Sequence, residues 1–168
     1  MEKYIGDIKK KHCLPFEIED KKMHELFSFF LHKAPTIEST TALLIAKEKL
    51  TKNWKTFKDN NDNLNFRFFS ESTQINEKNL KQYGCSIEDK VDRRDKFIIC
   101  NRKKKEESDL ECVLRHVRNS IAHNNIYIIY KGRRKFILFE DYNRNGKLTS
   151  RMLLSQTVLN SLRIEIKR

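Results

Sequence analysis

The sequence lacks the patterns that mark membrane proteins, disulfide-rich secreted proteins and structural zinc sites. No apolar run approaches the roughly 20 residues that a helix needs to cross a bilayer, and the opening MEKYIGDIKKKH has no hydrophobic signal core. Four cysteines are present, and no two of them form a CxxC or CxxH pair. These cysteines are Cys13, Cys85, Cys100 and Cys112. The absences predict a cytoplasmic protein with reduced thiols, no metal site, no cofactor and no membrane partner.

Internal repeats and low-complexity linkers are also absent, and a length of 168 residues predicts one domain over residues 1–168. What the chain has in excess is positive charge. It contains 35 Lys and Arg residues against 23 Asp and Glu, a formal net charge of +12. Such an excess favours a polyanionic partner such as RNA, since cations neutralise phosphates and release counterions. A solvated, lysine-rich surface is the alternative.

Hydrophobic periodicity predicts a mainly α protein, a helical bundle with one small β-hairpin. Apolar residues at steps of three and four predict helices over residues 18–33, 36–57, 77–83 and 110–123, and a final helix that Thr149 caps. Residues 86–100 are a further candidate helix, and 64–69 a candidate strand. The hairpin is expected from IYIIY (126–130) and FILF (136–139), with the basic turn between them.

The segment LECVLRHVRNSIAHNN, residues 110–125, is the most informative stretch. Its apolar stripe is interrupted by Arg115, His116, Arg118, Asn119 and Ser120, where a core helix needs no polar residue. Ser108 or Asp109 can cap its start, and the two asparagines after residue 123 favour its end. Arg118 and the following histidine, five positions apart, lie about 140° apart around an ideal helix. Only fraying of the last turn or a second copy of the helix would bring them together.

Within this segment, RNSIAH (118–123) matches the R-x4-H motif of HEPN domains, and the chain resembles that family most closely over residues 110–154. LRHVRNSIAHNNIYI, FILFEDYN and SRMLLS are similar to the branch found in plasmid, toxin–antitoxin and phage-defence settings. The resemblance implies an up-and-down helical bundle and a metal-independent endoribonuclease. It also implies a composite cleft at a homodimer interface, a 2′,3′-cyclic phosphate product and, as a frequent companion, a nucleotidyltransferase-type antitoxin.

The residues fit that chemistry, because an arginine, an amide and an imidazole without paired carboxylates favour transesterification over metal-dependent hydrolysis. His123 would be the general acid or base, Arg118 would stabilise the phosphate, and Asn119 would orient either group. RNA contacts are expected from Arg115 and from the hairpin turn. The turn residues are Lys131, Arg133 and Arg134.

Three alternatives stay open. His123 could be a helix C-cap, with Arg118 paired to Glu111, Glu140 or Asp141. The chain could be a non-catalytic module that binds RNA or a nucleotide. It could also be an interaction protein whose helix face serves only dimerisation.

Overall fold

The chain is built around a six-stranded mixed β-sheet. The computed structural model describes residues 3–36, 42–91 and 96–168, except for the side chains of Lys3 and Lys131. Its helices are α1 (Ile5–Ile8), α2 (Lys21–Ser28), the π-helix η1 (Phe29–Lys33), α3 (Lys47–Asn60), α4 (Glu77–Lys81), α5 (Asp109–Ala122) and α6 (Gln156–Lys167). Its strands are β1 (Lys3–Tyr4), β2 (His12–Cys13), β3 (Asn65–Phe69), β4 (Lys90–Val91), β5 (Phe97–Asn101), β6 (Ile126–Lys131), β7 (Arg134–Tyr142) and β8 (Leu148–Ser155).

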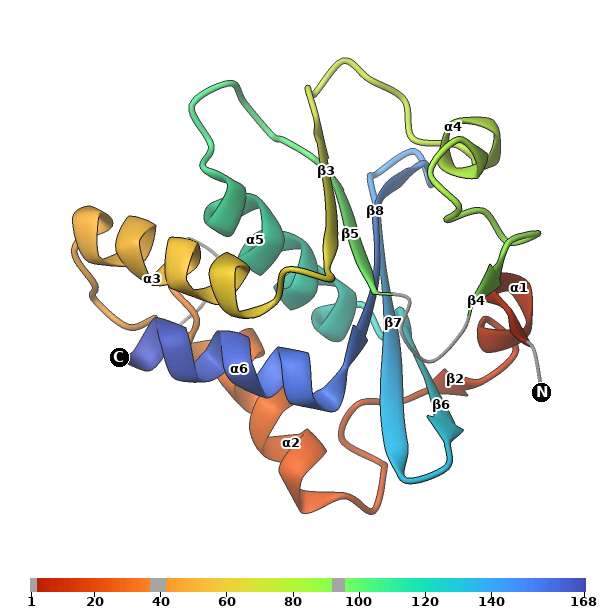
Figure 1. The fold of residues 1–168 in the computed structure, drawn as a ribbon, viewed down its shortest axis with the longest axis horizontal. Coiled ribbons are helices and arrows are strands. Elements are labelled where there is room, and N and C mark those ends of the chain that lie inside the picture. The colour runs from red at the N-terminus through yellow and green to blue at the C-terminus, as the bar shows by residue number, and fades with distance from the viewer. Residues whose placement is uncertain (1–2, 37–41, 92–95) are drawn as a thin grey trace.

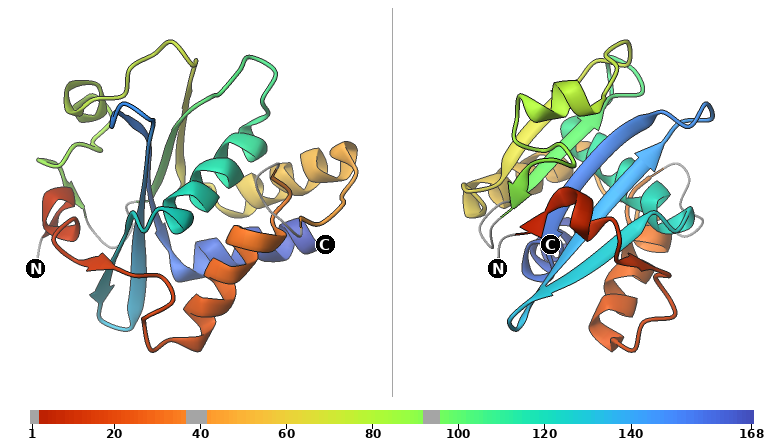
Figure 2. Two further views of the ribbon diagram at one scale, coloured as in Figure 1. Left: turned by 180° about the vertical axis from the view of Figure 1, so that it is seen from behind. Right: turned by 90° about the vertical axis from the view of Figure 1, so that its right-hand side faces the viewer.

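The large sheet has the strand order β2-β6-β7-β8-β5-β3, and β1 pairs with β4 separately. All neighbours in the large sheet are antiparallel except β3 and β5, which run parallel. Figure 1 shows α2, α3, α5 and α6 on one face of the sheet and α1 and α4 on the other. The views in Figure 2 show the same two layers from behind and from the side. The sheet is therefore covered on both faces.

Each central strand supplies two hydrophobic cores, because successive side chains point to opposite faces of a sheet. In β7, Ile137 and Phe139 pack with the α2, α3, α5 and α6 layer, whereas Phe136 and Leu138 pack beneath α1 and α4. In β8, Met152 and Leu154 join the first core and Leu153 joins the second. Strands buried on both faces have apolar runs instead of alternation.

The predicted mainly α class is wrong, since the protein is α+β with a six-stranded sheet. The hairpin is not an appendage, because β6 and β7 are inner strands of that sheet. Residues 148–155 form β8 instead of the start of the last helix, and Ser155, not Thr149, caps α6 by accepting a bond from the Val158 amide. Apolar runs that are buried on both faces do not distinguish a strand from a buried helix, which explains the error.

Two further segments differ from their predicted structure. The candidate helix over 86–100 is wrong, since this span contains β4 and β5, with residues 92–95 outside the described ranges. The predicted helix over 36–57 is shorter at its start: α3 begins at Lys47, and residues 37–41 also lie outside the described ranges. By contrast, the helix over 18–33, the strand over 64–69 and the helix over 110–123 are confirmed. No helix in the described ranges is long and apolar enough to span a membrane.

A buried ion-pair network ties α4 to the sheet. Arg151 of β8 lies opposite Glu140 of β7, and their side chains are 1% and 0% exposed. The Arg151 guanidinium bonds Glu77 of α4 at 2.8 Å and the Cys85 carbonyl at 2.9 Å. Lys9 lies 3.4 Å from Glu140, and the Tyr142 hydroxyl donates to the same carboxylate. Buried charges of both signs thus balance beneath α4.

We expect Arg151→Ala to lower the free energy of unfolding by about 3–5 kcal/mol, since it leaves Glu140 buried with too little compensating charge. Urea denaturation followed by circular dichroism measures the loss. The control is Arg168→Ala, which removes an exposed guanidinium and should change stability by less than about 1 kcal/mol. A loss for Arg151→Ala as small as that of the control would contradict the network's role.

Candidate active site

α5 lies over a polar row of the sheet. Cys100 of β5 pairs with Ser150 of β8, and Ser150 pairs with Asp141 of β7. Asp141 and Cys100 both contact α5, so the row faces that helix. α5 meets the row with Cys112, His116 and Asn119, three residues that share one side of the helix. The polar residues that interrupt the apolar stripe are thus matched by polar residues of the sheet.

The helix itself is formed by strong local signals. Ser108 and Glu111 make a capping box, in which the Ser108 hydroxyl accepts from the Glu111 amide and the Glu111 carboxylate accepts from the Ser108 amide. At the other end, Asn124 has a positive φ of 59°. The backbone N–H of its neighbour Asn125 donates a hydrogen bond to the Ser120 carbonyl oxygen. The helix therefore ends at Ala122, and His123 is its C-cap.

His116 and Asp141 form the centre of the site. His116 is 1% exposed, and its Nδ1 lies 2.8 Å from Asp141 Oδ2. Its Nε2 lies 2.8 Å from the Asn101 carbonyl oxygen. The carboxylate and carbonyl oxygens both accept hydrogen bonds, an arrangement that favours a proton on each ring nitrogen and so the imidazolium form. His116 is therefore a buried histidine with a partner at each ring nitrogen.

Two opposing effects set the pKa of His116. Burial lowers it, but the hydrogen bonds to Asp141 and Cys112 outweigh burial and raise the pKa from 6.5 to about 9. The pKa of Cys112 is lowered to about 6, because Cys100 and the imidazolium hydrogen-bond its sulfur. Burial raises the pKa of Cys100 well above its usual value.

A cavity of about 530 Å³ opens beside this network. Arg115, His116 and Asn119 line it from α5, and Arg102 and Lys103 from the segment before α5. Lys147, Thr149 and residues 71–75 also line the cavity. It is thus a polar, largely basic depression whose wall includes one residue of the R-x4-H segment.

Arg102 and Arg115, which line the cavity, each form an ion pair with a carboxylate. Arg115 Nε donates to Glu107 at 2.7 Å, and Arg102 pairs with Asp109. Burial opposes a low pKa for Glu107, but the bonds from Arg115 and the Lys103 amide lower it. Lys103 and Lys147 have no ion pair with any residue that the structure describes, so these two lysines are the unpaired cations of the cavity.

The structure joins only part of the predicted catalytic set. Arg118 Nη1 donates to Asn119 Oδ1 at 3.1 Å, and Asn119 Nδ2 donates to Asp141 Oδ2 at 3.1 Å. The buried Arg118 Nε has no partner among the described residues. His123 is exposed, and its imidazole makes no hydrogen bond within the described part of the chain. Neither Arg118 nor His123 lines the 530 Å³ cavity.

The alternative ion pairs considered for Arg118 do not form. Glu140 pairs with Arg151 and Lys9, Asp141 accepts from His116, and Glu111 caps its own helix. Arg118 reaches Asp141 only through Asn119. Its guanidinium is therefore oriented by an amide and is not neutralised by a carboxylate in the described ranges.

The predicted RNA-contact residues do not gather around His123. Arg115 is half-buried and paired with Glu107. Arg133 and Arg134 are exposed at the hairpin turn, where Gly132 has a φ of 62°. Because β6 runs away from the end of α5, this turn lies about 16–20 Å along the strand from Ile126. The side chain of Lys131 lies outside the described residues.

Sequence reasoning missed the parts of this network that depend on tertiary contacts. Asp141, Asn101 and Glu107 each hold a residue of α5, and no local pattern in the sequence indicates these contacts. Cys112 is buried in the core, and its sulfur lies 3.2 Å from the Asn101 carbonyl oxygen. The available signal was spacing, since Cys112, His116 and Ser120 follow steps of four along one helix.

The raised pKa of His116 contributes stability that is lost as the pH rises from about 6.5 to about 9, whereas the lowered pKa of Cys112 contributes in the opposite direction between about 6 and 9. Asp141→Asn removes the charge that raises the pKa of His116. Relative to the wild type, the variant should therefore gain at least about 1 kcal/mol of stability as the pH rises from about 6.5 to about 9. Urea unfolding of both proteins at the two pH values measures the difference. An equal change in both proteins would show that Asp141 does not hold His116 charged.

Comparison with known proteins places the chain in a family. A family model described as HEPN pEK499 p136 matches residues 3–167, nearly the whole chain. No curated protein and no solved structure gives a match. The match agrees with the resemblance carried by RNSIAH, although the fold around that segment is α+β. The chain is a member of the HEPN pEK499 p136 family.

Proposed function

We propose that this HEPN-family protein is a metal-independent endoribonuclease of the toxin or abortive-infection type. The observation that carries the proposal is the state of the R-x4-H segment: His123 is exposed at the end of α5, while Arg118 is held in place through Asn119. An exposed, unbonded imidazole can reach a substrate, and an arginine without a carboxylate partner keeps its charge for a phosphate.

RNA provides its own nucleophile, so the protein needs only proton transfer and charge stabilisation. The ribose 2′-hydroxyl attacks the adjacent phosphorus while the bond to the 5′-oxygen of the next nucleotide breaks, which leaves a 2′,3′-cyclic phosphate. His123 takes the hydroxyl proton or gives one to the leaving oxygen. Arg118 offers parallel N–H donors to the phosphate oxygens as their negative charge grows.

Asn119 acts as a positioning residue for Arg118. Its amide oxygen accepts from the guanidinium, and its amide nitrogen donates to Asp141. Asp141 is held in turn by the buried His116. This chain of bonds fixes the arginine against the sheet, so that the guanidinium needs no rearrangement when a phosphate arrives.

A homodimer would complete the site. Arg118 and His123 leave α5 about 140° apart if the helix is regular, and the helix continues through Ala122 before the C-cap. Two copies that meet at the ends of α5 would place the arginine of each chain near the histidine of its partner, doubling both groups in one cleft. In the cytoplasm such a nuclease requires restraint, which we assign to a cognate antitoxin of nucleotidyltransferase or another type.

The cavity beside α5 favours a second candidate function, binding of RNA or a nucleotide without cleavage. Lys103 and Lys147 line this cavity without an ion pair to any described residue. The side-chain amides of Asn101 and Asn119 line the same cavity. Such a module would bind with a strong salt dependence. It would depend on these lysines, or on Arg133 and Arg134 at the hairpin turn, and not on His123.

We expect His123→Ala to reduce RNA cleavage about 10²–10⁴-fold by loss of the proton-transfer group, and Arg118→Ala to reduce it about 10²–10³-fold by loss of phosphate stabilisation. Purified proteins are incubated with total and transfer RNA in EDTA, and fragments are resolved on denaturing gels. The matched control is His32→Ala, an exposed histidine on η1, which should cleave as the wild type does.

Equal cleavage by the wild type and both motif variants would refute the catalytic assignment. If none of the proteins cleaves but all retard RNA on a native gel, the binding module is the better description. Removal of Arg133 and Arg134 together should then lower the slope of log affinity against log salt by about 1.4, because each phosphate contact on a single strand contributes about 0.7.

Mixing the two inactive variants tests the composite site. If Arg118 of one chain works with His123 of its partner, a heterodimer of Arg118→Ala with His123→Ala contains one intact site. Random exchange of subunits should then restore about one quarter of wild-type activity, since half of the dimers are mixed and each has one of two sites. Co-expression with two affinity tags provides the mixed dimer. No recovery in that dimer would place each site within one chain.

A further inference from the structure

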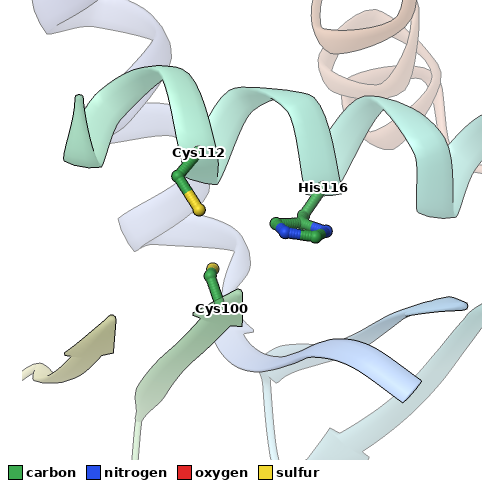
Figure 3. A group of neighbouring side chains, drawn as sticks. All are labelled: Cys100, Cys112 and His116. Atoms are coloured by element: carbon green, nitrogen blue, oxygen red, sulfur yellow. The ribbon is translucent and has the colours of Figure 1, made fainter. Parts of the chain in front are cut away.

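Three potential metal ligands converge between α5 and the sheet. Cys100 comes from β5, whereas Cys112 and His116 come from one side of α5. Their ligand atoms all lie within 4.8 Å of one another, and all three residues are buried. Figure 3 shows the two thiols directed toward each other, with the His116 ring beside them. We infer that this cluster binds one thiophilic d¹⁰ metal ion, Zn²⁺ in the first instance.

The spacing suits tetrahedral zinc. With Zn–S bonds of about 2.3 Å and Zn–N bonds of about 2.0–2.1 Å, tetrahedral ligand atoms lie roughly 3.5–3.8 Å apart. The ligand atoms of the cluster lie no more than 4.8 Å from one another, so a small side-chain movement would bring them to these separations. Cys112 and His116 are four residues apart, which places both on one helix face, as in helical metal sites. Thiolate and imidazole are the ligands that zinc prefers to oxygen.

The surroundings of His116 favour metal binding by Nε2. Asp141 accepts from Nδ1 at 2.8 Å, so the carboxylate fixes the ring and leaves the other nitrogen to face the cluster. Metal-bound histidines generally have such a carboxylate partner. Asn119 holds Asp141 from a second direction, and Ser150 Oγ lies 3.6 Å from Cys100 Sγ. The ligand side chains therefore belong to a strand and a helix, and hydrogen bonds to neighbouring residues limit their movement.

Binding would exchange two contacts with the Asn101 carbonyl oxygen for metal bonds. Nε2 now lies 2.8 Å from the Asn101 carbonyl oxygen, and Cys112 Sγ lies 3.2 Å from the same atom. Zn²⁺ would bind both cysteines as thiolates and His116 through an unprotonated Nε2, so binding releases the protons that these atoms carry. The Asn101 carbonyl keeps its bond from Arg115 Nη2 at 3.1 Å. This oxygen lies beside two of the three ligand atoms and would be available for the fourth position.

The ion would have a structural role. It would join β5 to α5, the helix that contains the R-x4-H segment, by bonds in addition to side-chain packing. Asn101 and His116 both line the 530 Å³ cavity, which gives the ion a path from solvent. This inference does not rest on the proposed nuclease activity, and its test does not use RNA.

The test uses the full chain, reduced with a phosphine and freed of metal. Zn²⁺ stoichiometry is measured by mass spectrometry of the equilibrated protein, and Co²⁺ is added as a spectroscopic probe. We expect one ion per chain, thiolate-to-cobalt charge-transfer bands in the near ultraviolet and the visible bands of tetrahedral cobalt. Asp141→Asn should weaken binding about 10–100-fold, because it removes the partner of the histidine ligand.

Cys100→Ser and Cys112→Ser should each abolish the charge-transfer bands of the native complex. The matched control is Cys85→Ser, a buried cysteine on the opposite face of the sheet, which should bind as the wild type does. If a serine variant fails to fold by circular dichroism, the number of thiolates is taken from the band intensity of the wild-type cobalt complex.

Three results would overturn the proposal. These are no ion bound by the reduced wild type, an octahedral cobalt spectrum without charge-transfer bands, and unchanged binding in folded Cys100→Ser or Cys112→Ser. A Cys100–Cys112 disulfide that persists in the phosphine-reduced protein, detected by thiol counting, would also overturn it, since thiolates joined to each other cannot ligate the ion.

Discussion

The contact between His116 and Asp141 is the interaction on which the rest of the site depends. It crosses from α5 to the middle of the sheet at 2.8 Å and is buried. One oxygen of Asp141 also accepts from Asn119, which holds Arg118. The other ring nitrogen of His116 reaches the Asn101 carbonyl, next to Cys100 in β5. A single carboxylate–imidazole pair therefore orients Arg118 through Asn119 and holds the His116 ring beside Cys100 and Cys112.

The helices could be predicted where local signals decide them, and the sheet could not. α5 has a capping box, an apolar stripe and a terminating asparagine, all visible in the sequence. β8 has none of these: Met152, Leu153 and Leu154 are buried on alternate faces, so the strand is uniformly apolar. β5 pairs with β3 and β8, which are distant in the chain. The sheet depends on such non-local pairing, and periodicity does not contain that information.

The features of the site also divide into those that the local sequence predicts and those that depend on non-local strand pairing. The R-x4-H segment and its place at the end of a helix follow from the residues alone, and the family match over residues 3–167 shows membership of the HEPN pEK499 p136 family. The burial of His116 and the convergence of Cys100 with Cys112 follow only from register, because β7 and β5 must lie under the same side of α5. The scattered cysteines gave no pairing in the sequence, yet two of them meet in the fold.

If His123 and Arg118 cleave RNA by transesterification, the chemistry of the product shows it. RNA fragments produced in EDTA are analysed by mass spectrometry for the group at their 3′ ends. Transesterification predicts a 2′,3′-cyclic phosphate whose yield falls with His123→Ala. Fragments that end in a 3′-hydroxyl, with a phosphate on the 5′ side of the cut, would show attack by water and would contradict it.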